Sequence, residues 1–186
     1  MILPLFRRPS RTIAALYGAI VAQAREPRFY ADLGVPDTVL GRFDMVLLHV
    51  VLVLRRLRAG GTAERAFAQD LFDRFCRDID DNLREMGISD QGVPRQMQRV
   101  GEAFYGRAQA YEAALAEGAD EGALVQALAR NVYLDTGESS CAAWLAHYVR
   151  NASQALDKQS LSVLAGGVAH FPAPEFVRDC ATKSLP

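Results

Sequence analysis

The chain has 186 residues, half of them apolar, and a formal net charge of −1 at pH 7. This length suits one domain with a sizeable core, and the near-zero charge argues against a sequence-specific nucleic-acid partner. The charge is uneven, because residues 1–60 carry nine arginines and four acidic residues, whereas residues 61–92 carry four arginines and eight acidic residues. The basic first third suits an anionic lipid surface, ribosomal RNA or an acidic partner, with a merely solvated surface as the alternative.

The cysteines and histidines indicate neither a metal site nor another cofactor. Cys76, Cys141 and Cys180 are scattered, which fits a reducing compartment, and the three histidines lack ligand spacing. The first residues are apolar before they are basic, the reverse of a secretory signal. The apolar run at residues 45–54 is far shorter than the roughly 20 residues that span a bilayer. We therefore expect a cytoplasmic protein, which stays on the cytoplasmic side of any membrane.

Helical periodicity predicts an all-α fold, a single-domain bundle of about seven helices with an irregular C-terminal tail. The first helix is expected from Ser10 to just before Pro27, with a short turn over residues 27–33. The next, over residues 38–58, is apolar on all sides and is therefore predicted to be central. Further helices are expected at residues 62–86, 94–115, 120–134, 141–156 and 160–164.

The predicted organisation has three parts: an N-terminal amphipathic helix within residues 1–28, a helical domain over 29–165 and an irregular tail over 166–186. In the first part, basic residues precede an apolar stripe, a pattern typical of a helix that lies on a membrane surface. Packing of this stripe on the protein's own core is the alternative. The membrane-facing candidates are Arg7, Arg8 and Arg11.

Residues 33–44 predict a turn followed by a helix start, because they read L-G-V-P-D-T-V-L-G-R-F-D. Gly34 can take positive φ, and both Asp37 and Thr38 are good N-caps. Arg42 opposes the helix dipole at this end of the helix. Its position therefore indicates a specific carboxylate partner, either inside the fold or on another protein.

Further segments around this turn form an ordered pattern: Phe29-Tyr30, Gly41-Arg42-Phe43-Asp44, Leu48-His49, Leu71-Phe72-Asp73, residues 82–87, Gly92-Val93-Pro94, residues 104–107 with Tyr111, and Ala129-Arg130-Asn131. Together with residues 33–44, this pattern resembles the ubiquinol–cytochrome c chaperone family over about residues 29–148. The resemblance implies a helical assembly factor without catalytic residues. It implies binding of newly made cytochrome b, or another subunit, during assembly of the ubiquinol–cytochrome c reductase, respiratory complex III. Mitochondrial relatives work near the ribosomal exit region.

Such a role implies a contact surface instead of a catalytic group. The candidates for contact with a client or partner are Phe29, Tyr30, Val39, Arg42, Met45, Leu48, His49, Leu52, Tyr105, Arg107 and Arg130. A place in the core is the alternative for the apolar ones. For His49, an imidazole that is satisfied within the core is favoured over a contact to client or haem. Arg107 and Arg130 are expected to reach outward to a client or a membrane phosphate.

Two other function classes stay open. Asp78, Asp80 and Asp81 form a D-I-D-D string, which suggests an all-α prenyl- or lipid-processing enzyme that binds a metal. Successive residues of a helix, however, are rotated by about 100°, so these three side chains point in different directions. This favours a solvated helix face on which the aspartates form ion pairs with arginines such as Arg84. A generic membrane-peripheral adaptor is the third class.

Overall fold

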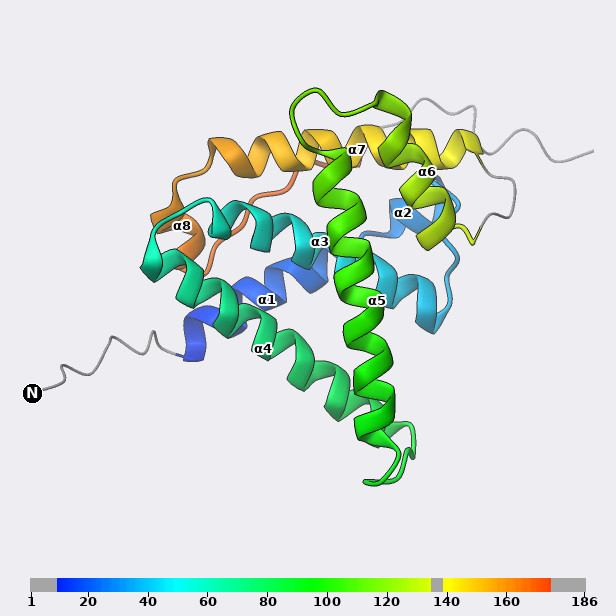
Figure 1. The fold of residues 1–186 in the computed structure, drawn as a ribbon, viewed down its shortest axis with the longest axis vertical. Helices are drawn as coiled ribbons and strands as arrows, with labels where there is room; N and C mark the ends of the chain where they lie inside the picture. The colour runs from blue at the N-terminus through cyan, green and yellow to red at the C-terminus, as the bar shows by residue number, and fades with distance from the viewer. Residues whose placement is uncertain (1–9, 135–138, 175–186) are drawn as a thin grey trace, which may run out of the picture.

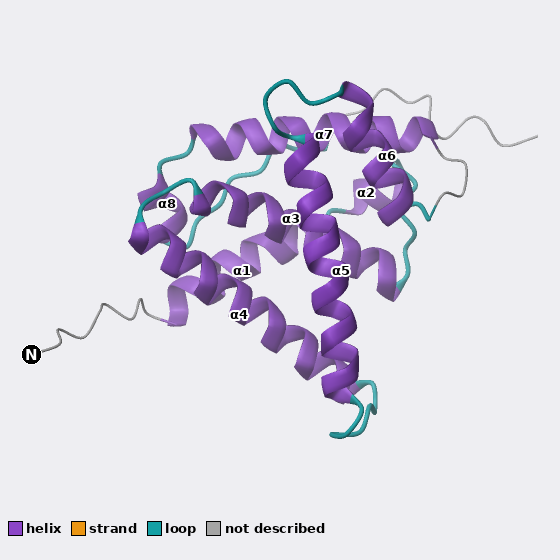
Figure 2. Ribbon diagram, in the orientation of Figure 1, coloured by secondary structure: helices purple, strands orange, loops and turns teal. Residues whose placement is uncertain are grey.

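The computed structural model describes residues 10–134 and 139–174, and every regular element in these ranges is a helix (Figure 2). This confirms the prediction of an all-α fold of about seven helices, with one short additional helix, α2, in the predicted turn. The helices are α1 (Ser10–Ala24), α2 (Pro27–Ala31), α3 (Val39–Arg58), α4 (Thr62–Glu85), α5 (Val93–Ala114), α6 (Glu121–Asn131), α7 (Ser139–Lys158) and α8 (Leu161–Ala165).

Helix α3 is the central element, as predicted from its all-round apolar pattern. Every residue from Asp44 to Leu54 except Val46 is buried. The helix packs against α1, α4, α5, α7 and α8. In Figure 1, α5 crosses in front of α3, while α4 and α5 converge on a tip at the bottom of the view. The core of the protein is therefore built around α3.

The turn before α3 is fixed by its backbone. Gly34 has a φ of 64°, the left-handed conformation expected there. The Thr38 hydroxyl accepts a hydrogen bond from the Gly41 backbone N–H at 3.1 Å, which confirms Thr38 as the N-cap. A Cβ atom on Gly41 would lie only 2.0 Å from the carbonyl oxygen of Pro36. Gly41 thus lets the first turn of α3 pack directly on the preceding loop.

Helix α1 lies against α3 and α4 and points its apolar stripe into the core. Leu16 and Ile20 are fully buried, and Ile13 and Tyr17 nearly so. This corrects the expectation that the stripe lies on a membrane, because these side chains are already covered by protein. Of the basic candidates, Arg11 is exposed, whereas Arg7 and Arg8 lie outside the described residues.

The described part of the tail is irregular, as predicted, and is packed on the helices. The Gln23 side chain of α1 donates to the Pro172 carbonyl at 3.3 Å. The Gln159 side chain accepts from the His170 N–H at 3.0 Å and donates to the His170 carbonyl at 2.7 Å. These bonds hold residues 170–172 against α1 and the end of α7.

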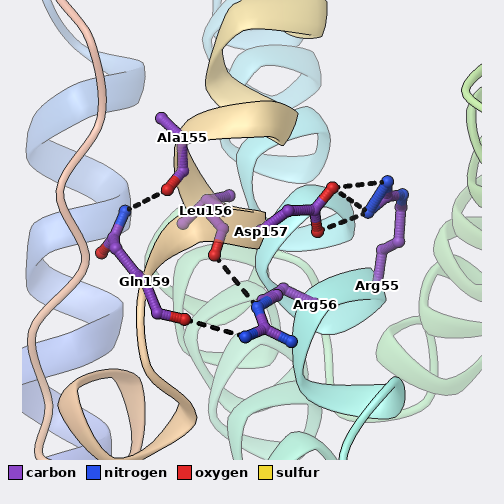
Figure 3. Close-up of polar contacts among 6 residues, drawn as sticks. All are labelled: Arg55, Arg56, Ala155, Leu156, Asp157 and Gln159. Atoms are coloured by element: carbon purple, nitrogen blue, oxygen red, sulfur yellow. Dashed lines mark hydrogen bonds and ion pairs between the residues drawn. The ribbon is translucent and has the colours of Figure 1, made fainter.

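Two arginines at the end of α3 hold the C-terminal end of α7 (Figure 3). Arg55 donates to both carboxylate oxygens of Asp157 at 2.9 to 3.1 Å. Arg56 donates from Nε to the Leu156 carbonyl at 3.0 Å and from a terminal nitrogen to the Gln159 carbonyl at 2.8 Å. The last carbonyls of a helix have no intrahelical donor, so Arg56 supplies one.

Replacing Gly41 with alanine should destabilise the fold by about 2 kcal/mol or more, because the added methyl group meets backbone that cannot turn aside. The matched control is Gly101→Ala in α5, where an added Cβ has no neighbour within 4 Å. That change should be neutral or stabilise by up to about 1 kcal/mol through helix propensity. Urea unfolding measures both, and equal midpoints for the two variants would contradict the close contact.

Replacing Arg56 with alanine should cost about 1–3 kcal/mol, because two charge-assisted hydrogen bonds to helix-end carbonyls are lost. Arg56→Lys should restore little, since an ammonium cannot reproduce the planar fork. The control is Arg58→Ala, which removes only an exposed pair with Glu112 and should cost less than about 1 kcal/mol. Thermal unfolding of the three variants tests this order, and a larger loss for Arg58→Ala would contradict it.

Candidate functional site

Five of the predicted contact residues lie in the core. Each is at most 2% exposed, so none is available to a client while the helices are packed. For these residues the structure shows the alternative that the sequence left open, because α3 and its neighbours cover them on every side. They are Phe29, Met45, Leu48, His49 and Leu52.

His49 is a satisfied core imidazole, as the sequence favoured. Its Nδ1 lies 2.7 Å from the Met45 carbonyl, which can only accept, so Nδ1 carries the proton. Its Nε2 then accepts from the Tyr148 hydroxyl at 2.8 Å, and that hydroxyl accepts from Gln23 at 3.1 Å. Burial lowers the pKa of His49 to about 4, against the opposing effect of the Met45 hydrogen bond. His49 therefore joins α3 to α7 as a neutral group.

Arg107 points into the protein, which corrects the expectation that it reaches outward. A terminal nitrogen lies 3.1 Å from Oδ1 of Asp44, and the two side chains are 14% and 2% exposed. Burial raises the pKa of Asp44 to about 7, although Arg107 acts in the opposite direction. This ion pair ties the start of α3 to α5.

The first turn of α3 brings other predicted residues to the surface. Val39 is 74% exposed, and Leu40, which the sequence analysis missed, is 49% exposed. Arg42 is also exposed, and its Nε lies 2.6 Å from the Asp37 carboxylate. Asp37 is thus the internal partner that was one of the two expectations for Arg42. This hydrogen bond holds the pKa of Asp37 below its usual range.

A surface pocket of about 500 Å³ opens beside this turn, lined by Arg25, Pro27, Tyr30, Ala31, Asp37 and Arg42. The Tyr30 hydroxyl donates to the Ala24 carbonyl at 2.7 Å, which fixes the ring across the end of α1. The ring centroid lies 6.0 Å from the Arg42 guanidinium carbon. The sequence pointed to Tyr30 and Arg42 but missed Arg25, which lies outside the family pattern. We call Arg25, Tyr30, Val39, Leu40 and Arg42 the α2–α3 surface.

Two further candidates lie on other helices. Tyr105 of α5 is 62% exposed, with its ring near Phe72 and Phe104. Arg130 is exposed near the end of α6. Both stay candidates for a contact surface separate from the α2–α3 surface, because they are carried by different elements.

The aspartates of the D-I-D-D string do not converge. Asp78 accepts a hydrogen bond from the Tyr17 hydroxyl of α1 at 2.9 Å, whereas Asp80 pairs with Arg84 one turn further along α4 at 2.7 Å. Asp81 is exposed. Across residues 10–134 and 139–174, no three His, Cys, Asp or Glu side chains are grouped so that they can hold a metal ion. The geometry therefore gives the enzyme alternative no support.

Taken together, these features define an all-α protein that carries exposed apolar side chains and a surface pocket beside its central helix. Within the described ranges, no helix is long and apolar enough to cross a membrane. Residues 31–171 match the family described as Ubiquinol-cytochrome C chaperone. The chain belongs to this family, which confirms the resemblance seen in the sequence and gives it a chaperone role for the ubiquinol–cytochrome c reductase.

A solved structure agrees with this assignment. The crystal structure of the Cbp3 homolog from Brucella abortus is 43% identical in sequence and superposes with a TM-score of 0.81. The alignment covers 94% of this chain and 98% of the other. None of the curated proteins matches the chain. The similar structure thus supports both the fold and the family.

His49 should make the folded state less stable in acid. The unfolded chain protonates this histidine near pH 6.5 but the folded chain only near pH 4, so folding weakens as pH falls through this window, by about 3 kcal/mol in total. Asp44 acts in the opposite direction, because its folded-state pKa is raised. The difference in unfolding free energy between the wild type and His49→Gln reports the contribution of the histidine alone. This difference should fall by about 3 kcal/mol from pH 7 to pH 4.

NMR titration of the His49 ring provides a direct check on the wild-type protein. A midpoint near pH 4 is expected for this ring. A midpoint for His49 at its ordinary value, or a difference in unfolding free energy that does not change with pH, would contradict the buried neutral imidazole.

Proposed function

We propose that this protein binds newly made cytochrome b and holds it until the ubiquinol–cytochrome c reductase, respiratory complex III, is assembled. The membership of the chaperone family over residues 31–171 carries this proposal. In this role the protein binds and releases its client and forms no covalent bond with it. The proposed place of action is the cytoplasmic face of the inner membrane, where a new membrane protein is accessible. Contacts with the ribosome exit region and with lipid stay predictions.

We further propose the α2–α3 surface as the client-binding site. A helix dipole favours acidic residues in the first turn, but α3 has none there. It has instead the exposed apolar side chains of Val39 and Leu40, followed by Arg42. These residues do little for the stability of a helix start. They are the side chains that suit an apolar partner with complementary charge.

Contacts of the start of α3 with its surroundings hold the α2–α3 surface in place. The Thr38 cap and the Gly41 contact fix the first turn of α3, and the Asp44–Arg107 ion pair fixes the next. A binding surface that is ordered before the partner arrives loses little conformational entropy on binding. This rigidity supports direct capture of a client segment, without prior rearrangement of the chaperone.

Deleting the gene should lower both the amount of cytochrome b and the activity of the reductase, because unprotected cytochrome b is lost before assembly. The measurements are the haem b absorbance of membranes and the rate of cytochrome c reduction by ubiquinol. A plasmid copy of the gene should restore both. Normal values of both in the deletion strain would overturn the proposed function.

In the same strain, the double variant Val39→Asp, Leu40→Asp should restore at most a tenth of the cytochrome b that the wild-type copy restores, because two charges replace the apolar contact. Both positions are exposed, so unfolding midpoints should change little. The matched control is Val163→Asp in α8, another exposed valine, which should restore wild-type levels. Equal restoration by the double variant and the control would remove the α2–α3 surface as the site.

A further inference from the structure

The pocket of the α2–α3 surface contains an arginine that forms no ion pair with the residues that the structure describes. Arg42 is paired with Asp37 at 2.6 Å, and the neighbouring Arg28 pairs with Asp32 at 3.7 Å. Arg25 forms no ion pair with any carboxylate in the described part of the chain, although it lines the same pocket. The pocket therefore presents one uncompensated positive charge.

The walls around this charge are largely apolar. Besides Arg25, the pocket is lined by Pro27, Ala31, Tyr30 and the Asp37–Arg42 pair. Val39 and Arg42 are three residues apart on α3 and are thus neighbours on its surface. Val39 therefore provides an exposed apolar surface next to Arg42, at the edge of the pocket. A matching ligand combines a negative charge with apolar groups beside it.

We infer that this pocket binds a carboxylate side chain of the client through Arg25, while apolar residues of the same client segment cover Val39 and Leu40. This inference rests on the proposed chaperone function and adds the chemistry of the segment that is recognised. A phosphate group fits less well, because it carries more negative charge and would lie beside the Asp37 carboxylate. Arg42 holds the pKa of Asp37 low, so that carboxylate is ionised.

Charge reversal at Arg25 tests the inference in the full-length protein. Tagged chaperone is purified from cells of the deletion strain, and the cytochrome b that co-purifies is measured. Arg25→Glu should recover at least tenfold less than the wild type, while Arg25→Lys should recover nearly as much. The control is Arg65→Glu, which changes an exposed arginine of α4 and should match the wild type.

A carbodiimide cross-link identifies the group that is bound. This reagent joins an amine to a carboxylate as an amide, and the natural chain has lysines only at positions 158 and 183. The Arg25→Lys protein should therefore give a new cross-linked peptide from the client, joined through an aspartate or glutamate. The Arg65→Lys protein should not.

The outcomes separate the two proposals. If the wild type recovers no cytochrome b, the proposed function fails. If the wild type and Arg25→Glu recover equal amounts, only the inference fails. Flotation with vesicles that contain the anionic lipid phosphatidylglycerol covers the lipid alternative. Loss of flotation by Arg25→Glu with undiminished recovery of cytochrome b would overturn binding of a client carboxylate.

Discussion

The fold depends on the burial of α3 on all sides. Helices α1, α4, α5, α7 and α8 pack against it, so every polar group along its middle needs a partner from another element. Asp44 takes Arg107 from α5, and His49 takes Tyr148 from α7. These pairs lie about one and a half and nearly three turns into the helix, and each one specifies which neighbouring helix packs there. The burial of α3 thus sets the arrangement of the bundle as well as its stability.

The sequence predicted the local structure of this centre well. All-round apolarity placed residues 38–58 in the middle, and Thr38 and Gly34 have the roles expected of a cap and a turn glycine. Such signals are local, since they depend on neighbouring residues only. The same all-round apolarity hid the surface, because it gives no direction in which a side chain points. The pattern therefore predicts Met45 and Leu48 as contact candidates together with Val39, and of these three only Val39 is exposed.

The polar pairs could not be predicted from the sequence, for a different reason. Arg107 was expected to reach outward because its partner Asp44 is 63 positions earlier in the chain, and nothing in the spacing links them. The hydrogen bond between Tyr17 and Asp78 spans 61 positions. Asp78, which belongs to the apparent metal motif, thus connects α4 to α1. Such pairs become visible only when the packing of the helices is known.

The two ends of α3 are stabilised in different ways. At the C-terminal end, the side chains of Arg55 and Arg56 are used to hold α7 (Figure 3). At the N-terminal end, stability comes from the backbone of Gly41 against Pro36 and from one hydroxyl cap. Because the backbone fixes this end, Val39 and Leu40 are not needed in the core and stay exposed. The α2–α3 surface, which we propose as the client-binding site, can therefore carry apolar and charged side chains without weakening the helix that presents it.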